Sequence, residues 1–271
     1  MPKQTFKYEI CELSKETVPL YCVCLEDWSD EMKEAGNHKA LWYEKMKDKG
    51  LRVKLAKNNK GEIGGMIQYF PAEYAGVNAP GMLFIQCIWV HGYKKGRGNF
   101  QKKGMGTALI KAAEEDAKSL GADGLIAWGL ALPFWMKASW YKKRGFKIAD
   151  KQDMMILLWK QFKENAQEPK LIRKQKDPLN NIQKDKVIIS AFINGVCPVG
   201  GLNYEKSKKA ALSFKEKVEF REINTYEPEV IKEWGITDAV YINNNLITAG
   251  PPLSYEKILK LIKKEVKKLP G

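Results

Sequence analysis

The segment Asn99–Lys118 reads NFQKKGMGTALIKAAEEDAK and sets two glycines, Gly104 and Gly106, directly before an amphipathic helix. A helix start presents backbone N–H groups that lack intrahelical partners, together with the positive end of the helix dipole. Glycine lets a ligand approach the backbone closely and tolerates positive φ angles. The segment therefore predicts a binding site for a phosphate-bearing ligand. A solvated glycine turn is the alternative, because short glycine motifs often occur by chance.

The flanking sequence predicts an α/β fold with a mixed sheet. Met82–Val90 (MLFIQCIWV) is a near-continuous apolar run, typical of a strand buried on both faces. Met105–Leu120 keeps its apolar residues at helical spacing, and Leu125–Trp128 predicts a second buried strand. Further strands are expected at Phe6–Leu13, Leu51–Lys57 and Glu62–Tyr69, helices within Lys15–Cys24, His38–Lys49 and Phe134–Lys143, and a hairpin between Gly145 and Trp159.

Length and composition favour two domains. The chain has 271 residues and 44% of them are hydrophobic, which is enough for globular cores in about two domains. Glu164–Asp185 is polar, contains two prolines and lacks a periodic apolar pattern, as a linker does. We therefore expect one domain at residues 1–163, a linker at 164–185 and a smaller domain at 186–271.

The charge balance favours an anionic small ligand over nucleic acid. Lys and Arg number 46 against 32 Asp and Glu, a net charge of +14. The basic residues are spread along the chain, and no nucleic-acid-binding signature accompanies them, so no specific nucleic-acid partner is expected. His91–Lys103 carries several basic residues and no carboxylate, which would complement a polyphosphate.

Cysteine usage and hydropathy point to a soluble protein of the reducing cytoplasm. Five cysteines without a CxxC pair make a disulfide framework or a structural zinc site improbable, and His38 and His91 are the only histidines. We therefore expect no metal. The most apolar run, Gly124–Met136, is interrupted by Pro133 and too short to span a bilayer, so no membrane association is expected.

Two motifs together resemble the GNAT superfamily of N-acetyltransferases. Gln101–Gly106 (QKKGMG) is similar to that family's (R/Q)xxGx(G/A) signature, and it lies between a buried strand and a helix as the family requires. Tyr141–Phe146 (YKKRGF) resembles the second signature, a helix ending in YxxxGF. The resemblance covers most of residues 1 to about 160 and implies the GNAT acyl-CoA N-acyltransferase fold.

The resemblance implies an acetyl-CoA-dependent N-acetyltransferase. In such proteins two parallel strands, here Met82–Val90 and Leu125–Trp128, separate into a V-shaped opening for the pantetheine arm, and an amine attacks the thioester directly in a ternary complex. The acceptor is expected to be a small-molecule or peptide amine, and Tyr141 is the expected acid that protonates the departing thiolate. By the same resemblance the cofactor-binding residues are Ile88, Trp89 and Val90 for pantetheine, and Gln101, Lys102, Lys103, Gly104, Met105, Gly106 and Thr107 for the pyrophosphate.

Several points stay open at the level of sequence. Tyr141 could instead be a core tyrosine, and the proton acceptor is unassigned, with a water chain, Glu62 or Glu73 as candidates. The family often carries an Asn where this chain has Phe134. The connection HGYKKGRGNF after Val90 is longer than usual, and two roles are open for it: covering the cofactor or shaping the acceptor site. Five aromatic residues could line the acceptor side, although core packing suits most of them: Trp42, Tyr43, Trp128, Trp135 and Trp140.

Residues 186–271 resemble a thioredoxin-like fold of βαβαββα order. Strands or helices are expected at 187–192, 204–214, 218–224, 227–234, 239–243, 246–248 and 254–268. Cys197 falls where that family places CxxC, but Gly200 replaces the second cysteine, and Asp238 stands at the expected cis-proline position. Dithiol exchange needs a resolving thiol, so Cys197 is a possible reactive thiol or an inert relic.

The domain order resembles the YoaP-like group of GNAT proteins. The alternative function is a thiol-dependent or redox-related binding protein that uses Cys197, with the GNAT domain as an acyl-CoA sensor.

Overall fold

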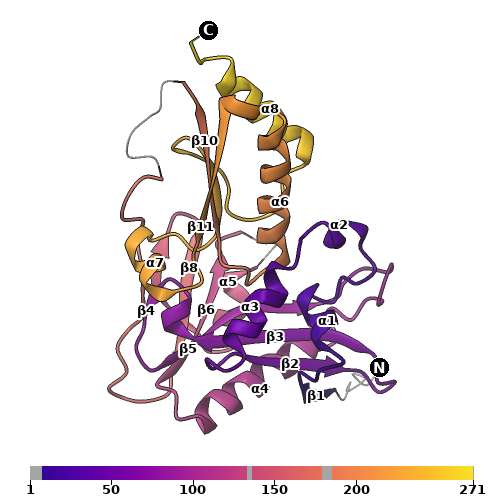
Figure 1. Ribbon diagram of the computed structural model, residues 1–271. Helices are drawn as coiled ribbons and strands as arrows, with labels where there is room; N and C mark the ends of the chain where they lie inside the picture. The colour runs from indigo at the N-terminus through magenta and orange to yellow at the C-terminus, as the bar shows by residue number, and fades with distance from the viewer. Residues whose placement is uncertain (1–7, 133–135, 179–184, 271) are drawn as a thin grey trace. The chain divides into compact units, whose positions relative to one another are not determined.

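The computed structural model describes residues 8–132, 136–178 and 185–270. They belong to two compact units (Figure 1). Unit 1 is Met1–Trp28 with Lys45–Ile172, and unit 2 is Ser29–Glu44 with Arg173–Gly271. The chain therefore leaves unit 1 after Trp28 and returns at Lys45, a path that the sequence pattern does not predict. The expectation that 1–163 and 186–271 are separate domains joined by 164–185 stays a prediction.

Unit 1 is built on a seven-stranded mixed sheet of order β1-β2-β3-β5-β6-β8-β7. The α/β expectation with a mixed sheet is confirmed, and the central strand β5 has the predicted bounds. The strands are β1 (Glu9–Glu12), β2 (Arg52–Lys57), β3 (Ile63–Pro71), β5 (Met82–Val90), β6 (Gly124–Leu130), β7 (Lys147–Gln152) and β8 (Met155–Gln161). A separate short pair, β4 (Val77–Asn78) with β9 (Lys170–Leu171), lies partly in the segment expected to be a linker.

The parallel pair β5 and β6 stays together over only part of its length. Pairing runs from Met82 opposite Gly124 to Ile85 opposite Ala127, and β5 then continues to Val90. A register shift in the β3–β5 ladder falls at the same place. Beyond the paired stretch, the indole Nε1 of Trp128 donates to the Gln86 carbonyl at 2.8 Å. The two strands thus separate where the sequence predicted a V-shaped opening.

The helices of unit 1 are α1 (Val18–Cys22), α4 (Met105–Ser119) and α5 (Ala138–Lys142), with the 3₁₀ turn η1 (Ala72–Tyr74). Helix α4 packs on β2, β3 and β5 (Figure 1). Its buried side chains are at helical spacing, as predicted, and the cluster beneath them includes Ile67, Tyr69 and Ile85. The start of the helix predicted at Phe134 lies outside the described residues.

A buried ionic cluster ties α4 to the sheet. The guanidinium of Arg52 on β2 binds both carboxylate oxygens of Asp116 on α4, at 2.9 and 2.8 Å, and the Tyr69 hydroxyl donates to the same carboxylate at 2.6 Å. Lys54 lies 3.4 Å from Asp116 and also pairs with Glu12. Burial alone would raise the pKa of Asp116, but the hydrogen bonds from Arg52 and Tyr69 outweigh it and lower that pKa. The cluster anchors the C-terminal end of α4 to β2 and β3.

Unit 2 carries a four-stranded sheet of order β11-β10-β12-β13. Strands β10 and β11 are parallel, and the other two pairs are antiparallel. Helices α6 and α8 pack together with one face of the sheet, and Trp234 of α7 packs in a second cluster with Phe192 (Figure 1). The elements are β10 (Val187–Ile193), α6 (Pro198–Leu212), η2 (Lys215–Lys217), β11 (Val218–Asn224), α7 (Pro228–Trp234), β12 (Ala239–Ile242), β13 (Asn245–Thr248) and α8 (Tyr255–Val266).

Residues 29–44 add α2 (Asp30–Lys33) and most of α3 (His38–Met46) to unit 2. His38 Nε2 lies 2.7 Å from a carboxylate oxygen of Glu205 on α6, and Lys206 donates to Glu31 at 2.7 Å. A Cβ on Gly201 would lie 2.3 Å from the Ala35 carbonyl oxygen. This close approach needs glycine in α6.

Helix α6 begins six residues earlier than predicted. The sequence predicts a start at Tyr204, whereas Pro198 is the first helical residue and Cys197 caps it. Gly200 and Gly201 lower helix propensity and masked the first turn. The fold needs glycine at both positions, because the Asp238 carboxylate and the Ala35 carbonyl lie too close to leave room for a side chain.

Asp116→Asn tests the anchoring of α4. The substitution leaves Arg52 and Lys54 with no carboxylate partner on α4, so we expect a loss of about 2–4 kcal/mol in the free energy of unfolding of unit 1. Glu168→Gln is the control, because its pair with Lys170 is about half exposed and should change stability by less than ~1 kcal/mol. Urea unfolding followed by near-UV circular dichroism measures both, and equal effects would contradict the anchoring role.

Candidate active site

The loop before α4 is exposed and its amides face outward. Residues 101–104 are exposed, whereas Met105 is buried beneath them. Gly104 has φ +93° and caps the helix, which a side chain would strain. At this helix start the backbone amides of Thr107 and Ala108 bond back to the Gly104 carbonyl. The preceding amides, those of Met105 and Gly106, therefore point out of the N-terminal end of α4.

Contacts outside the loop hold it open. The amide nitrogen of the Gln101 side chain donates to the Val90 carbonyl at 3.0 Å, which joins the loop to the end of β5. The Gln101 backbone N–H donates to the Asn99 side chain, and Lys103 Nζ donates to the Asn99 carbonyl at 2.8 Å. The Tyr8 hydroxyl binds the Lys103 carbonyl at 2.8 Å. These bonds involve side chains and the carbonyls of other residues, so they leave the amides before α4 uncovered.

The predicted pantetheine-binding residues lie on the part of β5 that extends beyond its pairing with β6. Ile88, Trp89 and Val90 pair with β3 on one side only. Ile88 and Val90 pack toward the α4 cluster. A Cβ on Gly106 would lie 3.7 Å from Val90 Cγ2 and 3.3 Å from Trp140, so the first turn of α4 lies close to this strand end. The strand edge and the amide turn thus adjoin.

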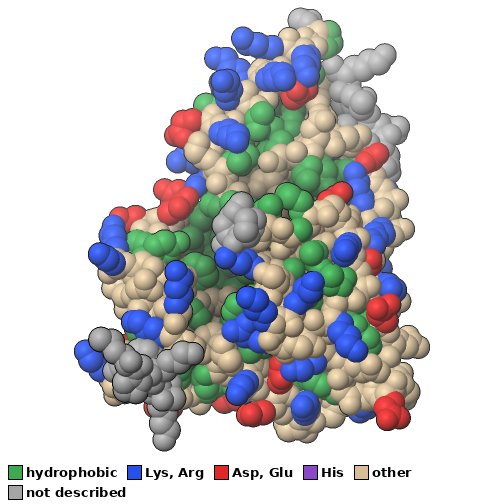
Figure 2. Space-filling view, turned by 180° about the vertical axis from the view of Figure 1, so that it is seen from behind, with side chains coloured by type: hydrophobic (Ala, Val, Ile, Leu, Met, Phe, Trp, Pro, Cys, Tyr) green, Lys and Arg blue, Asp and Glu red, His purple; other side chains and the backbone are tan. Residues whose placement is uncertain are grey.

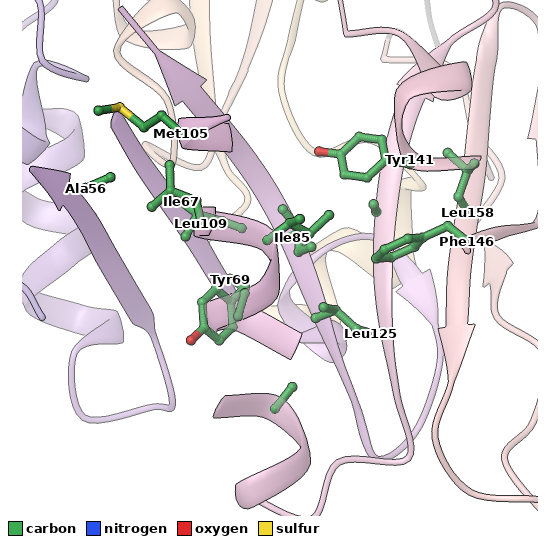
Figure 3. Packing of buried hydrophobic residues seen from close by; sticks show 14 of the residues in the cluster. Ala56, Ile67, Tyr69, Ile85, Met105, Leu109, Leu125, Tyr141, Phe146 and Leu158 are labelled. Carbon is green, nitrogen blue, oxygen red and sulfur yellow. The ribbon is translucent and has the colours of Figure 1, made fainter. Parts of the chain in front are cut away.

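Tyr141 is buried on α5, with 2% of its surface exposed. Its ring makes edge contacts with Trp140 and Phe146, and Figure 3 shows the hydroxyl directed away from Phe146 and Leu158. Among the described residues no hydrogen-bond partner reaches this hydroxyl. Burial raises the pKa of Tyr141, and the neighbouring Cys87 on β5 raises it further. The phenol stays protonated and can donate a proton near β5.

Arg144 joins the second motif to the first. Its guanidinium donates to the Thr107 hydroxyl at 2.8 Å and to the Trp140 carbonyl at 2.8 Å, and it stacks 3.5 Å from the centre of the Trp140 ring. Burial lowers the pKa of Arg144. An arginine side chain nevertheless keeps its charge in proteins. One residue of YKKRGF therefore positions the first turn of α4.

The comparisons decide the family. Residues 9–146 match the Acetyltransferase (GNAT) family. The chain belongs to this family. The expectation of a GNAT fold and of an N-acetyltransferase is thereby confirmed at the level of the family.

One curated relative is an uncharacterized N-acetyltransferase, YoaP, of Bacillus subtilis, which is 28% identical over 156 residues. The match spans 55% of this chain and 59% of the relative, so it covers less than two thirds of that protein.

Solved GNAT structures are similar in part of the chain. The PaiA N-acetyltransferase of Thermoplasma acidophilum, in complex with coenzyme A, is 17% identical with a TM-score of 0.43, and covers 58% of this chain and 99% of its own. A GNAT acetyltransferase of Brucella melitensis, in complex with acetyl-CoA, is 16% identical with a TM-score of 0.41, and covers 61% and 94%.

The connection after Val90 in this GNAT protein folds onto the loop that follows α1. Arg97 binds Asp27 through two hydrogen bonds of 2.9 Å, and a Cβ on Gly96 would lie 2.2 Å from the Trp28 ring. His91, which is fully buried, accepts a hydrogen bond from the Trp28 indole at 2.9 Å. The connection therefore shapes the side of β5 next to α1.

The proton acceptors considered from the sequence do not lie in a protected site. Glu62 is exposed and accepts a hydrogen bond from Asn58 at 2.6 Å, and Glu73 is exposed on η1. A carboxylate missed by sequence reasoning, Glu26, is half-buried and has an oxygen with no hydrogen-bond partner among the described residues. The sequence marks Glu26 only as an acidic residue between a short helix and Trp28. That pattern is too common to indicate a proton acceptor.

The aromatic candidates for the acceptor side have different surroundings. Trp128 bridges to β5, and Trp140 lies beneath Arg144. Trp42 is buried and belongs, with Tyr43, to unit 2. Trp135 lies outside the described residues, as does Phe134.

Figure 2 shows Lys and Arg side chains scattered over the visible face, with Asp and Glu among them.

In residues 8–132, 136–178 and 185–270, no group of three or more His, Cys, Asp or Glu side chains could hold a metal ion. None of the five cysteines is in a disulfide. No helix of the described chain has both the length and the apolar composition to cross a bilayer.

Cys197 of unit 2 is half-buried and caps α6. One turn on, a Cβ on Gly200 would lie 2.0 Å from the Asp238 carboxylate, so Asp238 fills the space that a side chain at 200 would need. Although Asp238 as a residue is half-buried, its carboxyl group is enclosed, and burial raises its pKa from 3.8 to about 7.

This shift predicts a pH-dependent stability for unit 2. Asp238 ionises near 3.8 in the unfolded chain and near 7 in the folded one. Its contribution is complete below pH 4 and is lost as the pH rises to 7, because ionisation then favours unfolding. Asp238→Asn should remove this dependence and raise stability at pH 8 by up to about 4 kcal/mol. Amide hydrogen exchange of β10 at pH 4–8 measures it, and an unchanged pH slope in the variant would refute the assignment.

Proposed function

We propose that this protein transfers an acetyl group from acetyl-CoA to an amine by direct attack in a ternary complex. The observation that carries the proposal is the adjacency of three features in unit 1. The exposed amide turn at 101–107 adjoins the end of β5 that is not paired with β6. The hydroxyl of Tyr141, which has no partner among the described residues, lies beside Cys87 of β5. The solved relatives that bind CoA or acetyl-CoA are consistent with it.

The donor side uses backbone groups and nearby lysines. Within the predicted loop Gln101–Thr107, the amides of Met105 and Gly106 would hold the pyrophosphate, since a helix N-terminus and its dipole favour an anion. The amides of Gln101 and Thr107 already donate within the chain. Lys102 and Lys103 are exposed in the turn and add positive charge. The backbone of Ile88, Trp89 and Val90 would pair with the pantetheine amides, although the Val90 carbonyl already accepts the Gln101 side chain. For the pantetheine arm to pair with the Val90 carbonyl, the Gln101 side chain would have to move away from it.

Tyr141 would act as the acid for the departing thiolate. Its hydroxyl is buried, protonated and unpartnered among the described residues. Such a group satisfies its hydrogen-bonding capacity only when a ligand atom is present, and a sulfur atom between β5 and β6 would supply that partner. A positioned acid contributes on the order of 10²-fold or more to a rate. The acceptor we propose is a small-molecule or peptide amine.

For unit 2 we propose a thioredoxin-like fold. The βαβαββα element order and the sheet order β11-β10-β12-β13 support this. Asp238 fills the space at Gly200, so a resolving thiol has no room there, and a dithiol activity is not supported. A binding role of the Cys197 thiol is the second candidate function, favoured by its position at the start of α6.

Tyr141→Phe tests the acid. We expect kcat to fall about 10²-fold, because the phenol proton is lost, while the affinity for CoA changes less than about twofold. The release of free CoA thiol from acetyl-CoA with a panel of primary amines gives kcat, and calorimetry gives the affinity. Tyr74→Phe is the control, since its ring contact with Lys49 remains and it lies outside the site. A Tyr141→Phe enzyme as fast as the wild type would show that the tyrosine is structural.

A further inference from the structure

Glu26 lies in the loop after α1, beside the indoles of Trp89 on β5 and Trp28. Burial raises the pKa of its carboxyl group, and hydrogen bonding to the indoles of Trp89 and Trp28 partly offsets this rise. Even so, neither Oε1 of Glu26 nor Nε1 of Trp89 has a well-formed hydrogen bond among the described residues, and both atoms are buried. A buried carboxylate oxygen and a buried indole N–H without a well-formed hydrogen bond keep bonding capacity for a ligand atom.

The rings of Trp28, Trp89 and Tyr93 form a cluster, here called the cage, that reaches the surface at Tyr93. The Tyr93 ring lies 6.0 Å from Trp28 and 6.4 Å from Trp89, centre to centre, and 52% of Tyr93 is exposed. Aromatic faces next to a carboxylate attract an ammonium group. Lys95 already places its ammonium 5.4 Å from the centre of the Trp28 ring. The Trp89 and Tyr93 faces are therefore the ones that a substrate would meet.

The backbone directs Glu26 into this cage. Cys24 and Leu25 both have positive φ angles, +51° and +63°, which is strained for residues other than glycine. The strain is held by hydrogen bonds from the Leu25 amide to Leu20 and from the Glu26 amide to Val23. Strained residues of this kind persist where the surroundings fix them, often at active sites.

The charged neighbours of Glu26 are accounted for. Asp27 is paired with Arg97. His91 Nδ1 faces the Gly98 carbonyl at 2.7 Å and so carries a proton, while its Nε2 accepts from Trp28 and carries none. A charge on His91 lowers the pKa of Glu26 and so partly offsets the effect of burial. With Lys95 on the outer face of Trp28, Glu26 is the one carboxylate described here that faces the cage without an ion-pair partner.

The cage also has a suitable position along β5. Trp89 is two residues beyond Cys87, the residue that influences Tyr141, so the two side chains share a face about 6.6 Å apart along the strand. Trp89 and Cys87 therefore connect the Glu26 carboxyl group with the stretch of β5 beside Tyr141.

We propose that Glu26 receives the acceptor: its carboxylate pairs with the substrate ammonium beside the Trp89 and Tyr93 rings and takes the proton that the nitrogen loses before attack. The inference rests on the proposed acetyl transfer and names its acceptor class, a primary amine on an apolar or aromatic chain. The neutral nitrogen forms the C–N bond to the acetyl carbon, and the C–S bond breaks. The thiolate takes the Tyr141 proton, Tyr141 regains one from the amide nitrogen, and Glu26 releases its proton to solvent.

The pH profile of Glu26→Gln with phenethylamine and acetyl-CoA tests the inference. In the wild type the reactive pair is carboxylate and ammonium, so kcat/KM should be flat between pH 7 and 9. In Glu26→Gln only the free amine reacts, so kcat/KM should fall on the order of 10²–10⁴-fold at pH 7 and rise about tenfold per pH unit. Parallel profiles in the two proteins would overturn the assignment, because a purely structural role lowers the rate without changing the slope.

Two further variants complete the experiment. Glu26→Asp keeps a carboxylate and should keep the flat profile at a rate lowered about tenfold; a full wild-type rate would contradict direct contact with the amine. Glu16→Gln removes an exposed carboxylate just before α1 and should match the wild type. Thermal melts establish that all variants fold.

Calorimetry separates the two proposals. Absence of CoA binding to the wild type would overturn the proposed function alone. Titration of phenethylamine into the protein then judges the amine site, where Glu26→Gln should bind at least tenfold more weakly. Equal affinities, or binding to neither protein, would overturn the role of Glu26.

Discussion

The site depends on one constraint: the first amides of α4 must stay open to solvent while the helix behind them is fixed. Open amides at a helix start are stable only in water or against an anion. The helix cannot shift to bury them, because Asp116 binds Arg52 on β2 and Tyr69 on β3. Gly104 in turn supplies the positive φ that lets the loop reach the helix without covering it.

Strand β5 separates two kinds of surface. One face packs on α4 and leads to the amide turn, and the other leads to α1 and Glu26. The separation of β5 from β6 after Ile85 leaves Tyr141, which packs in the α4 cluster, beside Cys87. Donor binding and acceptor binding can therefore be governed by different residues, and substitutions on one side should leave the other largely unchanged.

The sequence predicted those parts that local patterns determine. Strand β5 and helix α4 carry strong periodic signals, and QKKGMG with YKKRGF identified the family. It missed what depends on tertiary packing. The start of α6 was masked by Gly200 and Gly201, whose tolerance comes from Asp238 and Ala35, far away in sequence. Glu26 was missed because the rings beside it, Trp89 on β5 and Tyr93 after it, are far from it in sequence. No local pattern marks residues 29–44 as part of unit 2.

Hydrogen exchange of backbone amides with and without CoA tests the central claim most directly. If the turn before α4 holds the pyrophosphate, the amides of residues 101–107 should exchange at least tenfold more slowly with saturating CoA, and those of 87–90 should also slow. Amides of unit 2 should change little. Protection confined to unit 2, or no protection at 101–107 while CoA is bound, would contradict the account.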